Sequence, residues 1–395
     1  MNTFNIFKSL ISRSVVLLWL VLIIVAVRVD IVRAEDPFSI FPYLDGSIFN
    51  NEEAVDSSEN MPPYVIDKVA KYMNYFTTSG RSLFQHWLDQ SMPYMPLVKE
   101  ILREEGLPED LAFLPLIESG FNVNARSRAR ATGMWQFMAA TGARYGLRVN
   151  GWIDERRDPV KSTKAAALHL KDLYATFGSW PLALASYNAG SGKIKRTLDK
   201  SGSSTFWEIG QSRALAAETK NYIPKFMAAM IIARNPEAFG FTFMEVPAFR
   251  YDLLEVPGGM DVHAVAEHSG INYELLHYIN PELKGNITPL SESRYILRLP
   301  EGIGTVFIEN YNRLLPYERV IYKEYKVIKG DSVSKIAQKF DTTVSSIKKV
   351  NKLSKRNRIV KGKIVLIPVR LPYSADAVRL VTPPDVLSNM DELSS

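Results

Sequence analysis

The chain has 395 residues, 46% of them hydrophobic and 23% charged, which is ordinary for a globular protein and enough for two or three domains. The absence of cysteine excludes disulfides, thiolate metal sites, a cysteine nucleophile and a lipid-modified N-terminal cysteine. The net charge of +6 is unevenly distributed: residues 323–370 carry 14 Lys or Arg and 3 Asp or Glu, a net +11, so the remainder sums to −5.

The N-terminus has the plan of a secretory signal peptide. Lys8 and Arg13 precede an uninterrupted run of 13 apolar residues, Val15–Val27. The segment VRA (32–34) then places small residues where a signal peptidase requires them, so cleavage is expected after Ala34. An uncleaved membrane anchor is the alternative, but 13 residues fall short of the roughly 20 that span a bilayer. Residues 1–34 are therefore predicted to be a signal peptide, followed by a lead-in linker over 35–60. Either interpretation places the remaining chain outside the cytoplasm, in the periplasm or cell envelope.

Residues 61–243 are predicted to form a helical domain with its core at about 98–235. Asp158-Pro159 pairs an N-cap residue with a proline at the first helical position, and Gly178 closes the apolar-periodic segment that follows. Trp180-Pro181 begins another helix that ends at Gly190. A helix from Pro108 to Gly120 is expected to kink at Pro115, because proline lacks the N–H that continues the helical ladder.

Two similar segments follow the helical domain. The second, over 323–370, reads as a short strand, a Gly-Asp turn, two short helices and a closing strand. The first, over 244–302, repeats this order loosely and shares a helix that ends in asparagine before a strand, which indicates an internal repeat. Residues 303–322 are predicted to be a linker and 371–395 a disordered tail. The fold class is thus α+β multidomain, and a cut near Phe243 is expected to leave a helical fragment that folds alone.

Glu118 stands out because it follows the apolar run LPLI at a helix end. The negative end of the helix dipole and the apolar neighbours both disfavour the ionised carboxylate, so its pKa is predicted to be raised, as a general acid requires. The alternative is that Glu118 simply faces solvent at a helix terminus and has no catalytic role. Large contact groups and amides in GMWQF (133–137) and SYNAG (186–190) would suit a sugar ring. The five histidines show no ligand-like pairing with carboxylates, so no metal or other cofactor is predicted.

These motifs resemble the catalytic domain of lytic transglycosylases, which has a goose-lysozyme-like fold. The resemblance rests on order and spacing and covers about residues 60–370. Within the family it is to the membrane-bound D group of lytic murein transglycosylases, which carry LysM repeats. The motifs that carry it are LPLIESGFNVNARSRARATGMWQFMAATGARYGL (114–147), DERRDP (154–159), WPLALASYNAG (180–190), ETKNYIPKF (218–226) and, for LysM, YKVIKGDSVSKIAQKF (325–340).

The resemblance implies cleavage of the β-1,4 bond between N-acetylmuramic acid and N-acetylglucosamine, with formation of a 1,6-anhydro ring. Glu118 falls on the family's acid/base, which first protonates the leaving oxygen and then deprotonates the muramoyl C6 hydroxyl. Ser119 would orient that carboxylate or contact the acetamido group, and Met134 would pack against a sugar. The other residues that the resemblance places at the substrate are Gln136, Tyr187, Asn188 and, hydrogen-bonded near Glu118, Tyr222.

Blander roles stay open for several of these residues. Tyr187 and Tyr222 could be core tyrosines, and Asn188 only a helix-terminus residue. In DERRDP, Arg156 and Asp158 are expected to be structural, in a salt-linked turn. In the second repeat, the LysM resemblance implies glycan contacts by Gly330, Asp331, Ser332 and Asn351, and it makes the first repeat a degenerate LysM-like module.

The implied partners are peptidoglycan glycan strands and, further, other cell-wall proteins. The D group is typically lipid-anchored, but a chain without cysteine cannot be anchored in that way. A hydrolytic muramidase is one rival, since goose-type lysozyme shares the fold and Asp154, Glu155 and Asp158 could direct a water. A non-catalytic wall-binding scaffold is a second. A nucleic-acid binder is suggested only by the +11 segment, and a secretory signal disfavours it, so nucleic acid is not an expected partner.

Overall fold

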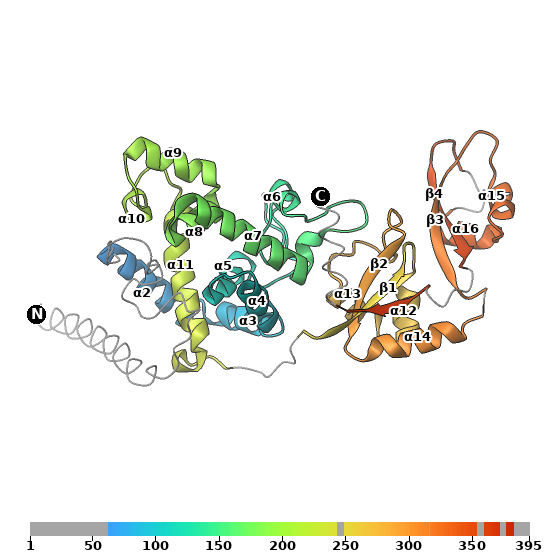
Figure 1. The fold of residues 1–395 in the computed structure, drawn as a ribbon, viewed down its shortest axis with the longest axis horizontal. Helices are drawn as coiled ribbons and strands as arrows, with labels where there is room; N and C mark the ends of the chain where they lie inside the picture. The colour runs from blue at the N-terminus through green and yellow to red at the C-terminus, as the bar shows by residue number, and fades with distance from the viewer. Residues whose placement is uncertain (1–61, 243–248, 316, 354–358, 372–376, 383–395) are drawn as a thin grey trace, which may run out of the picture.

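The computed structural model describes residues 62–242, 249–315, 317–353, 359–371 and 377–382. The predicted signal peptide and lead-in linker lie outside these residues. Helices make up the regular structure from residue 62 to 239, and strands begin at Tyr251 (Figure 1). The expected change of character near residue 243 is therefore seen on either side of 243–248, which also lie outside the described residues.

The helical half is organised around its last long helix, α11, which packs against α2, α5 and α8 (Figure 1). Helix α8 is apolar on nearly every side, so it is buried from Trp180 to Ser186. The α-helices are α2 (Pro63–Thr77), α3 (Arg81–Ser91), α4 (Met95–Glu104), α5 (Leu114–Ser119), α6 (Ala139–Arg144), α7 (Pro159–Phe177), α8 (Trp180–Ala189), α9 (Ser191–Ser201), α10 (Phe206–Ile209) and α11 (Ala217–Arg234). Short 3-10 helices cover Glu109–Phe113, Glu155–Arg157 and Pro236–Phe239.

The predicted helix boundaries around α7 are confirmed. The Asp158 carboxylate accepts hydrogen bonds from the backbone N–H groups of Val160 and Lys161, both at 2.9 Å, and so caps the helix. Gly178 ends it in the left-handed conformation, with φ of 62°. These two residues fix where α7 begins and ends.

The predicted kinked helix over 108–120 is wrong in detail. The chain forms a 3-10 helix at Glu109–Phe113 and then a separate α5, with Pro115 in the first turn of α5. The N–H groups of a first helical turn have no intrahelical acceptor, so proline costs nothing there, and a new helix start replaces the kink. Gly120 ends α5 as expected, with φ of 63°. Glu118 therefore lies in the last turn of a very short helix.

Two modules with the predicted β-α-α-β order follow in succession (Figure 1). We call them module 1 and module 2. Module 1 contains β1 (Tyr251–Pro257), α12 (Val262–Ser269), α13 (Tyr273–Ile279) and β2 (Arg294–Pro300). Module 2 contains β3 (Val320–Lys326), α15 (Val333–Lys339), α16 (Val344–Val350) and β4 (Ile364–Arg370). Both strand pairs are antiparallel, with Tyr251 opposite Pro300 and Val320 opposite Arg370.

The internal repeat is visible in matched hydrogen bonds. The Asn280 side chain, at the end of α13, donates to the Arg298 carbonyl and accepts from the Arg298 N–H. The Asn351 side chain, at the end of α16, makes the same two bonds with Leu366. In each module an asparagine thus ties the second helix to the closing strand, and Arg298 of module 1 takes the position of Leu366 in module 2.

Two predictions about the segments around the modules are wrong. The expected linker 303–322 contains helix α14 (Ile303–Arg313), which packs against α12 and buries Phe307 and Tyr311, four residues apart on one helix face. The expected disordered tail contributes β5 (Arg379–Val381), which pairs with β1 and makes a three-stranded sheet. Module 1 is thus larger than the repeat alone suggests.

Candidate active site and glycan-binding modules

Glu118 meets Tyr222 at the contact between α5 and α11. The Tyr222 hydroxyl donates a hydrogen bond to Oε1 of Glu118. Burial raises the pKa of the Glu118 carboxyl to about 7, although the Tyr222 hydrogen bond and the charge of Lys225 both lower it. The predicted direction of this pKa shift is confirmed, and the main cause is burial. Near neutral pH this carboxyl can therefore exist in both its protonated and its ionised form.

Helix α11 presents a second group to the same place. Lys225 lies one turn after Tyr222, and its ammonium donates to the carbonyl of Ile117 at 3.3 Å and lies 5.6 Å from the centre of the Trp87 ring. Burial lowers the pKa of Lys225, while the carboxylate of Glu118 opposes that shift. Sequence reasoning missed this residue, although its i, i+3 spacing from Tyr222 places it on the same helix face.

A tight hairpin over residues 126–137 packs beside this carboxyl. Thr132 pairs with both Arg126 and Phe137. The Ser119 hydroxyl donates to the Met134 carbonyl at 2.8 Å, and the Tyr187 hydroxyl donates to the Trp135 carbonyl at 2.8 Å. Ser119 therefore holds the hairpin backbone. In the described part of the chain its hydroxyl makes no hydrogen bond to Glu118, so the structure does not support an orienting role, and the alternative contact with the acetamido group stays a prediction.

Tyr187 nevertheless lies close enough to Glu118 to be affected by its charge. Burial and that negative charge raise the pKa of the Tyr187 hydroxyl well above its usual range, and the same two causes act on Tyr222. Both phenols therefore stay neutral donors at any pH of interest. The structure brings these two tyrosines, from α8 and α11, to the carboxyl on α5.

Three further residues were predicted to contact the sugar: Met134 and Gln136 in the hairpin and Asn188 on α8. Met134 is fully buried in the core of the helical domain, so the expected packing against a sugar is wrong for this structure. Gln136 is half-buried in a left-handed conformation with φ of 50°, and its amide nitrogen donates to the Gly133 carbonyl at 2.7 Å. Asn188 is half-buried at the end of α8, and its Oδ1 accepts from the Thr219 hydroxyl of α11 at 3.0 Å.

Each acidic residue of DERRDP forms an ion pair with an Arg or Lys side chain. Asp154 pairs with Arg156 at 2.8 Å, and Glu155 pairs with Arg148 at 2.8 Å and Lys161 at 2.6 Å. Asp158 caps α7 and, through its other oxygen, contacts Arg298 of module 1 at 2.6 Å. The predicted structural role of Arg156 and Asp158 is confirmed.

These ion pairs lower the pKa of each of the three carboxyls against the opposing effect of burial. Ionised groups held in this way are poorly placed to direct a water. Among the described residues, no three His, Asp or Glu side chains gather in a way that could hold a metal ion.

The four predicted glycan contacts in module 2 divide into a turn and a structural residue. Gly330 has φ of 92°, Asp331 accepts from the Ile328 N–H at 2.8 Å, and Ser332 caps α15. They form the turn between β3 and α15. The Asn351 side chain instead bonds only to backbone: its amide nitrogen donates to the carbonyls of Ile347 and Leu366, and its amide oxygen accepts from the Leu366 N–H. The structure thus gives Asn351 a structural role and contradicts the expected glycan contact.

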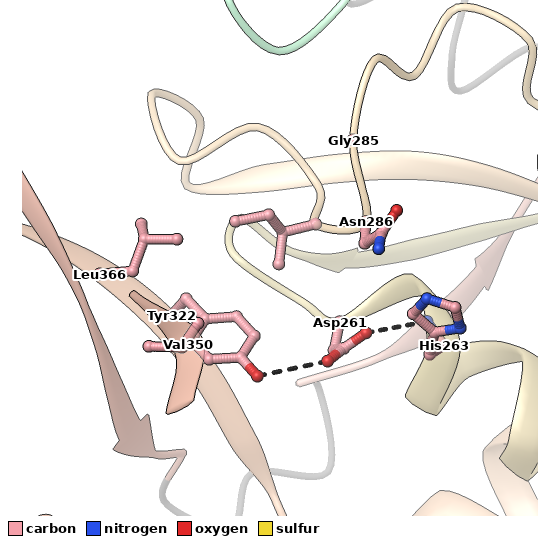
Figure 2. A pocket seen from close by; sticks show the side chains of 8 residues that line it. Asp261, His263, Gly285, Asn286, Tyr322, Val350 and Leu366 are labelled. Carbon is pink, nitrogen blue, oxygen red and sulfur yellow. Dashed lines mark hydrogen bonds between the residues drawn. The ribbon is translucent and has the colours of Figure 1, made fainter. Parts of the chain in front are cut away.

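A cavity of about 390 Å³ lies where the two modules meet (Figure 2). Asp261, His263 and Asn286 of module 1 line one side, and Tyr322, Val350 and Leu366 of module 2 line the other. The Tyr322 hydroxyl donates to Oδ2 of Asp261 at 3.3 Å across the boundary, as Figure 2 shows. Both modules thus contribute polar and apolar groups to the cavity, with Ile287 on the side of module 1 and the Tyr322 hydroxyl on the side of module 2.

Family models match three parts of the chain. Residues 96–209 match the transglycosylase SLT domain. Residues 325–368, within module 2, match the LysM domain, and residues 250–315 match the LysM-like domain of lytic transglycosylase MltD. The chain carries an SLT domain followed by two LysM-type modules. The match over 250–315 ends beyond α14, in agreement with the structure and against the predicted linker.

Several named proteins are similar to parts of this chain. Membrane-bound lytic murein transglycosylase D of Escherichia coli (strain K12) is 30% identical over 276 residues, which are 66% of this chain and 60% of that protein. Peptidoglycan transglycosylase gp16 of Escherichia phage T7 is 32% identical over 155 residues, 38% of this chain and 11% of that protein. The solved 70 kDa soluble lytic transglycosylase from Escherichia coli is 20% identical, with a TM-score of 0.33 over 45% of this chain and 32% of that chain. The chain thus spans less than two thirds of the length of membrane-bound lytic murein transglycosylase D.

Proposed function

We propose that this protein is a lytic transglycosylase that cleaves the β-1,4 bond between N-acetylmuramic acid and N-acetylglucosamine in peptidoglycan. The observation that supports this most is Glu118: a carboxyl with a pKa of about 7, hydrogen-bonded to a neutral tyrosine, in an SLT domain whose DERRDP carboxylates are all ion-paired. Most glycosidases use two carboxyl groups, whereas a reaction with an internal nucleophile needs only one.

The reaction proceeds in two proton transfers through Glu118. The protonated carboxyl first gives its proton to the glycosidic oxygen as the C1–O4 bond breaks, which releases the N-acetylglucosamine end with a free hydroxyl. The resulting carboxylate, held by the Tyr222 hydroxyl and near Lys225, then takes the proton from the muramoyl C6 hydroxyl. The C6 oxygen bonds to C1 and closes the 1,6-anhydro ring, so Glu118 ends protonated as it began. An internal nucleophile has a high effective concentration, so no activated water is needed.

Gln136, Tyr187 and Asn188 are proposed to line the cleavage subsites around Glu118. Two features support this placement. The neutral Tyr187 hydroxyl and the Asn188 amide both lie at the last turn of α8, and Asn188 bonds to α11 one turn before Tyr222. The left-handed backbone of Gln136 is also sparsely populated by residues other than glycine, and such conformations concentrate at functional sites.

Module 2 is proposed to bind glycan strands through the turn of Gly330, Asp331 and Ser332. Its sequence match to the LysM domain supports this, and its net charge of +11 over 323–370 adds attraction to the carboxylates of wall peptides. We propose export to the periplasm or cell envelope on the strength of the N-terminal signal pattern. Among the described helices, none has the length and apolarity to cross a membrane.

The mass of the released disaccharide-peptides tests the reaction. An anhydro product is one water lighter than a hydrolysed one, so digestion of purified sacculi is expected to give only the lighter series. Products with a reducing-end muramic acid would instead support a muramidase. In that case Glu218 would be the first carboxylate to suspect, because it is exposed, lies one turn before Tyr222 on α11, and its charge acts on Glu118. If the protein is a muramidase, the Glu218→Gln variant is expected to lose hydrolysis. If it is a transglycosylase, the same variant is expected still to release the anhydro product.

A further inference from the structure

Module 1 is joined to the helical domain by backbone pairing. The Asp154 N–H donates to the Glu282 carbonyl at 2.8 Å, and the Lys284 N–H donates to the Trp152 carbonyl at 2.9 Å. Between these bonds Ile153 pairs with Leu283, and Ile153 is fully buried in the hydrophobic cluster of the modules rather than in that of the helical domain. The DERRDP turn therefore belongs to both domains.

Buried charges reinforce the same contact. The Arg298 guanidinium, on β2, contacts the Asp158 carboxylate at 2.6 Å and the Glu282 carboxylate at 3.2 Å, and all three residues are at most 7% exposed. Removing the arginine from such a set leaves two buried carboxylates without their cation, which is strongly unfavourable. Two carboxylates and one arginine thus hold module 1 against the start of α7.

The repeat marks Arg298 as a departure from the common module design. Its structural equivalent in module 2 is Leu366, as the matched asparagine bonds show. Inside module 1 Arg298 pairs with Glu282 and lies over the Tyr251 ring, 5.5 Å from its centre. Its partner Asp158 belongs to the helical domain, so the substitution serves the contact between the domains.

From the DERRDP turn the contacts continue to the active-site hairpin. The Asp154 carboxylate binds Arg156, whose guanidinium donates to the carbonyls of Phe137 at 3.0 Å and Arg130 at 3.1 Å. The fit is close, because a Cβ on Gly133 would lie 1.7 Å from the Arg156 carbonyl oxygen. The same hairpin carries the carbonyls that accept from Ser119 and Tyr187 beside Glu118.

We propose that module 1 is a clamp for the active site, in which Arg298 and Glu282 act as positioning residues for glycan cleavage through the DERRDP turn and the hairpin 126–137. The expected effect on cleavage rests on the proposed function, whereas the expected effect on the order of the hairpin does not depend on it. Module 1 has kept the LysM-like architecture, but the face that carries Arg298 is committed to the helical domain.

The test compares Arg298→Met with Arg294→Met in the full-length protein. Arg294 lies on the same strand but contacts Glu255 and the Ala377 carbonyl, away from the helical domain, so it is a matched control. Hydrogen exchange is followed at the amides of Thr132 and Phe137, which bond to each other's carbonyls at 3.0 and 3.1 Å, and at the amides of α11 as a reference. Rates on soluble glycan and binding to sacculi are measured in parallel.

For Arg298→Met we expect exchange in the hairpin to rise at least about tenfold over that in α11. We expect kcat to fall by about 10- to 100-fold, the scale that displacement of catalytic groups by roughly 1 Å produces. KM and sacculus binding are expected to stay within about twofold, and Arg294→Met to behave like the unaltered protein. Unchanged hairpin exchange and kcat in a folded Arg298→Met variant would overturn the proposal. Equal acceleration of hairpin and α11 would do the same, since it would indicate general loss of stability.

If Arg298→Met does not fold, Asp158→Asn decides. Asparagine can still cap α7, whereas Arg298 loses its ion pair across the domain contact and keeps the one with Glu282. Faster exchange confined to the hairpin and the DERRDP turn supports the clamp, and unchanged exchange there refutes it. Because exchange needs no substrate, an absence of cleavage by the unaltered protein would count against the proposed function alone.

Discussion

Replacing Glu118 by glutamine is expected to abolish cleavage and, above neutral pH, to stabilise the fold. Glutamine has nearly the same shape and can still accept a hydrogen bond from Tyr222, but it can neither give nor take the proton. Loss of general acid catalysis alone typically costs about 10²–10⁴-fold. The effect on stability follows from the pKa of the Glu118 carboxyl, which is about 7 in the folded protein against an ordinary 4.5.

The sign of that effect depends on pH. Below pH 4.5 the carboxyl is protonated in both folded and unfolded chains, so its ionisation costs nothing. Between 4.5 and 7 the unfolded chain ionises first, which favours unfolding, and above 7 the full cost applies. At about 1.36 kcal/mol per pKa unit, this cost is about 3 kcal/mol. The stability gained by Glu118→Gln is therefore expected to be near zero at pH 4 and to approach that value by pH 8.5.

Urea denaturation at both pH values, followed by tryptophan fluorescence, measures the gain. Glu208→Gln is a suitable control because Glu208 completes a capping box on α10, where backbone hydrogen bonds lower its pKa, so glutamine is not expected to stabilise the fold at any pH. A gain for Glu118→Gln that is equal at pH 4 and 8.5, or no gain at 8.5, would show that burial does not hold the carboxyl near neutrality. Residual cleavage by the folded variant would place the catalytic role elsewhere.

Three further predictions concern the site and module 2. Tyr222→Phe removes a donor that lowers the pKa of Glu118, so the falling limb of the pH–rate profile is expected to move to higher pH, and an unmoved limb would contradict the assignment. Asn351→Ala is expected to lower the melting temperature of module 2, with glycan affinity per folded molecule unchanged, since its amide bonds only to backbone. Sacculus binding by residues 317–371 is expected to weaken with salt yet persist at high salt and be competed by chitin oligomers. Complete loss at moderate salt would make this module only a polycation.

Local signals in the sequence were sufficient for much of the fold. The N-cap at Asp158, the glycine at 178 and the βααβ repeat are decided by neighbours a few residues away, and the structure has them as predicted. The raised pKa of Glu118 also followed from its apolar neighbours. Contacts made by residues far apart in the chain could not be predicted in this way. The family resemblance placed Met134 against a sugar, but in this structure its side chain is fully buried in the core of the helical domain.

The contacts that cross the predicted domain boundary have the same physical origin. A cut near residue 243 follows the change in local pattern, but it would separate Ile153 from the modules among which it is buried and Asp158 from Arg298. A helical fragment ending there would expose Ile153 and leave Asp158 without its arginine at the start of α7. The hydrophobic clusters otherwise follow the predicted boundary, because one contains helical residues from Val65 to Phe241 and the other contains Ile153 together with apolar residues of both modules. Modules 1 and 2 share the second cluster, and the Tyr322 N–H donates to the Gly259 carbonyl across their junction, so a cut between the modules would divide a core.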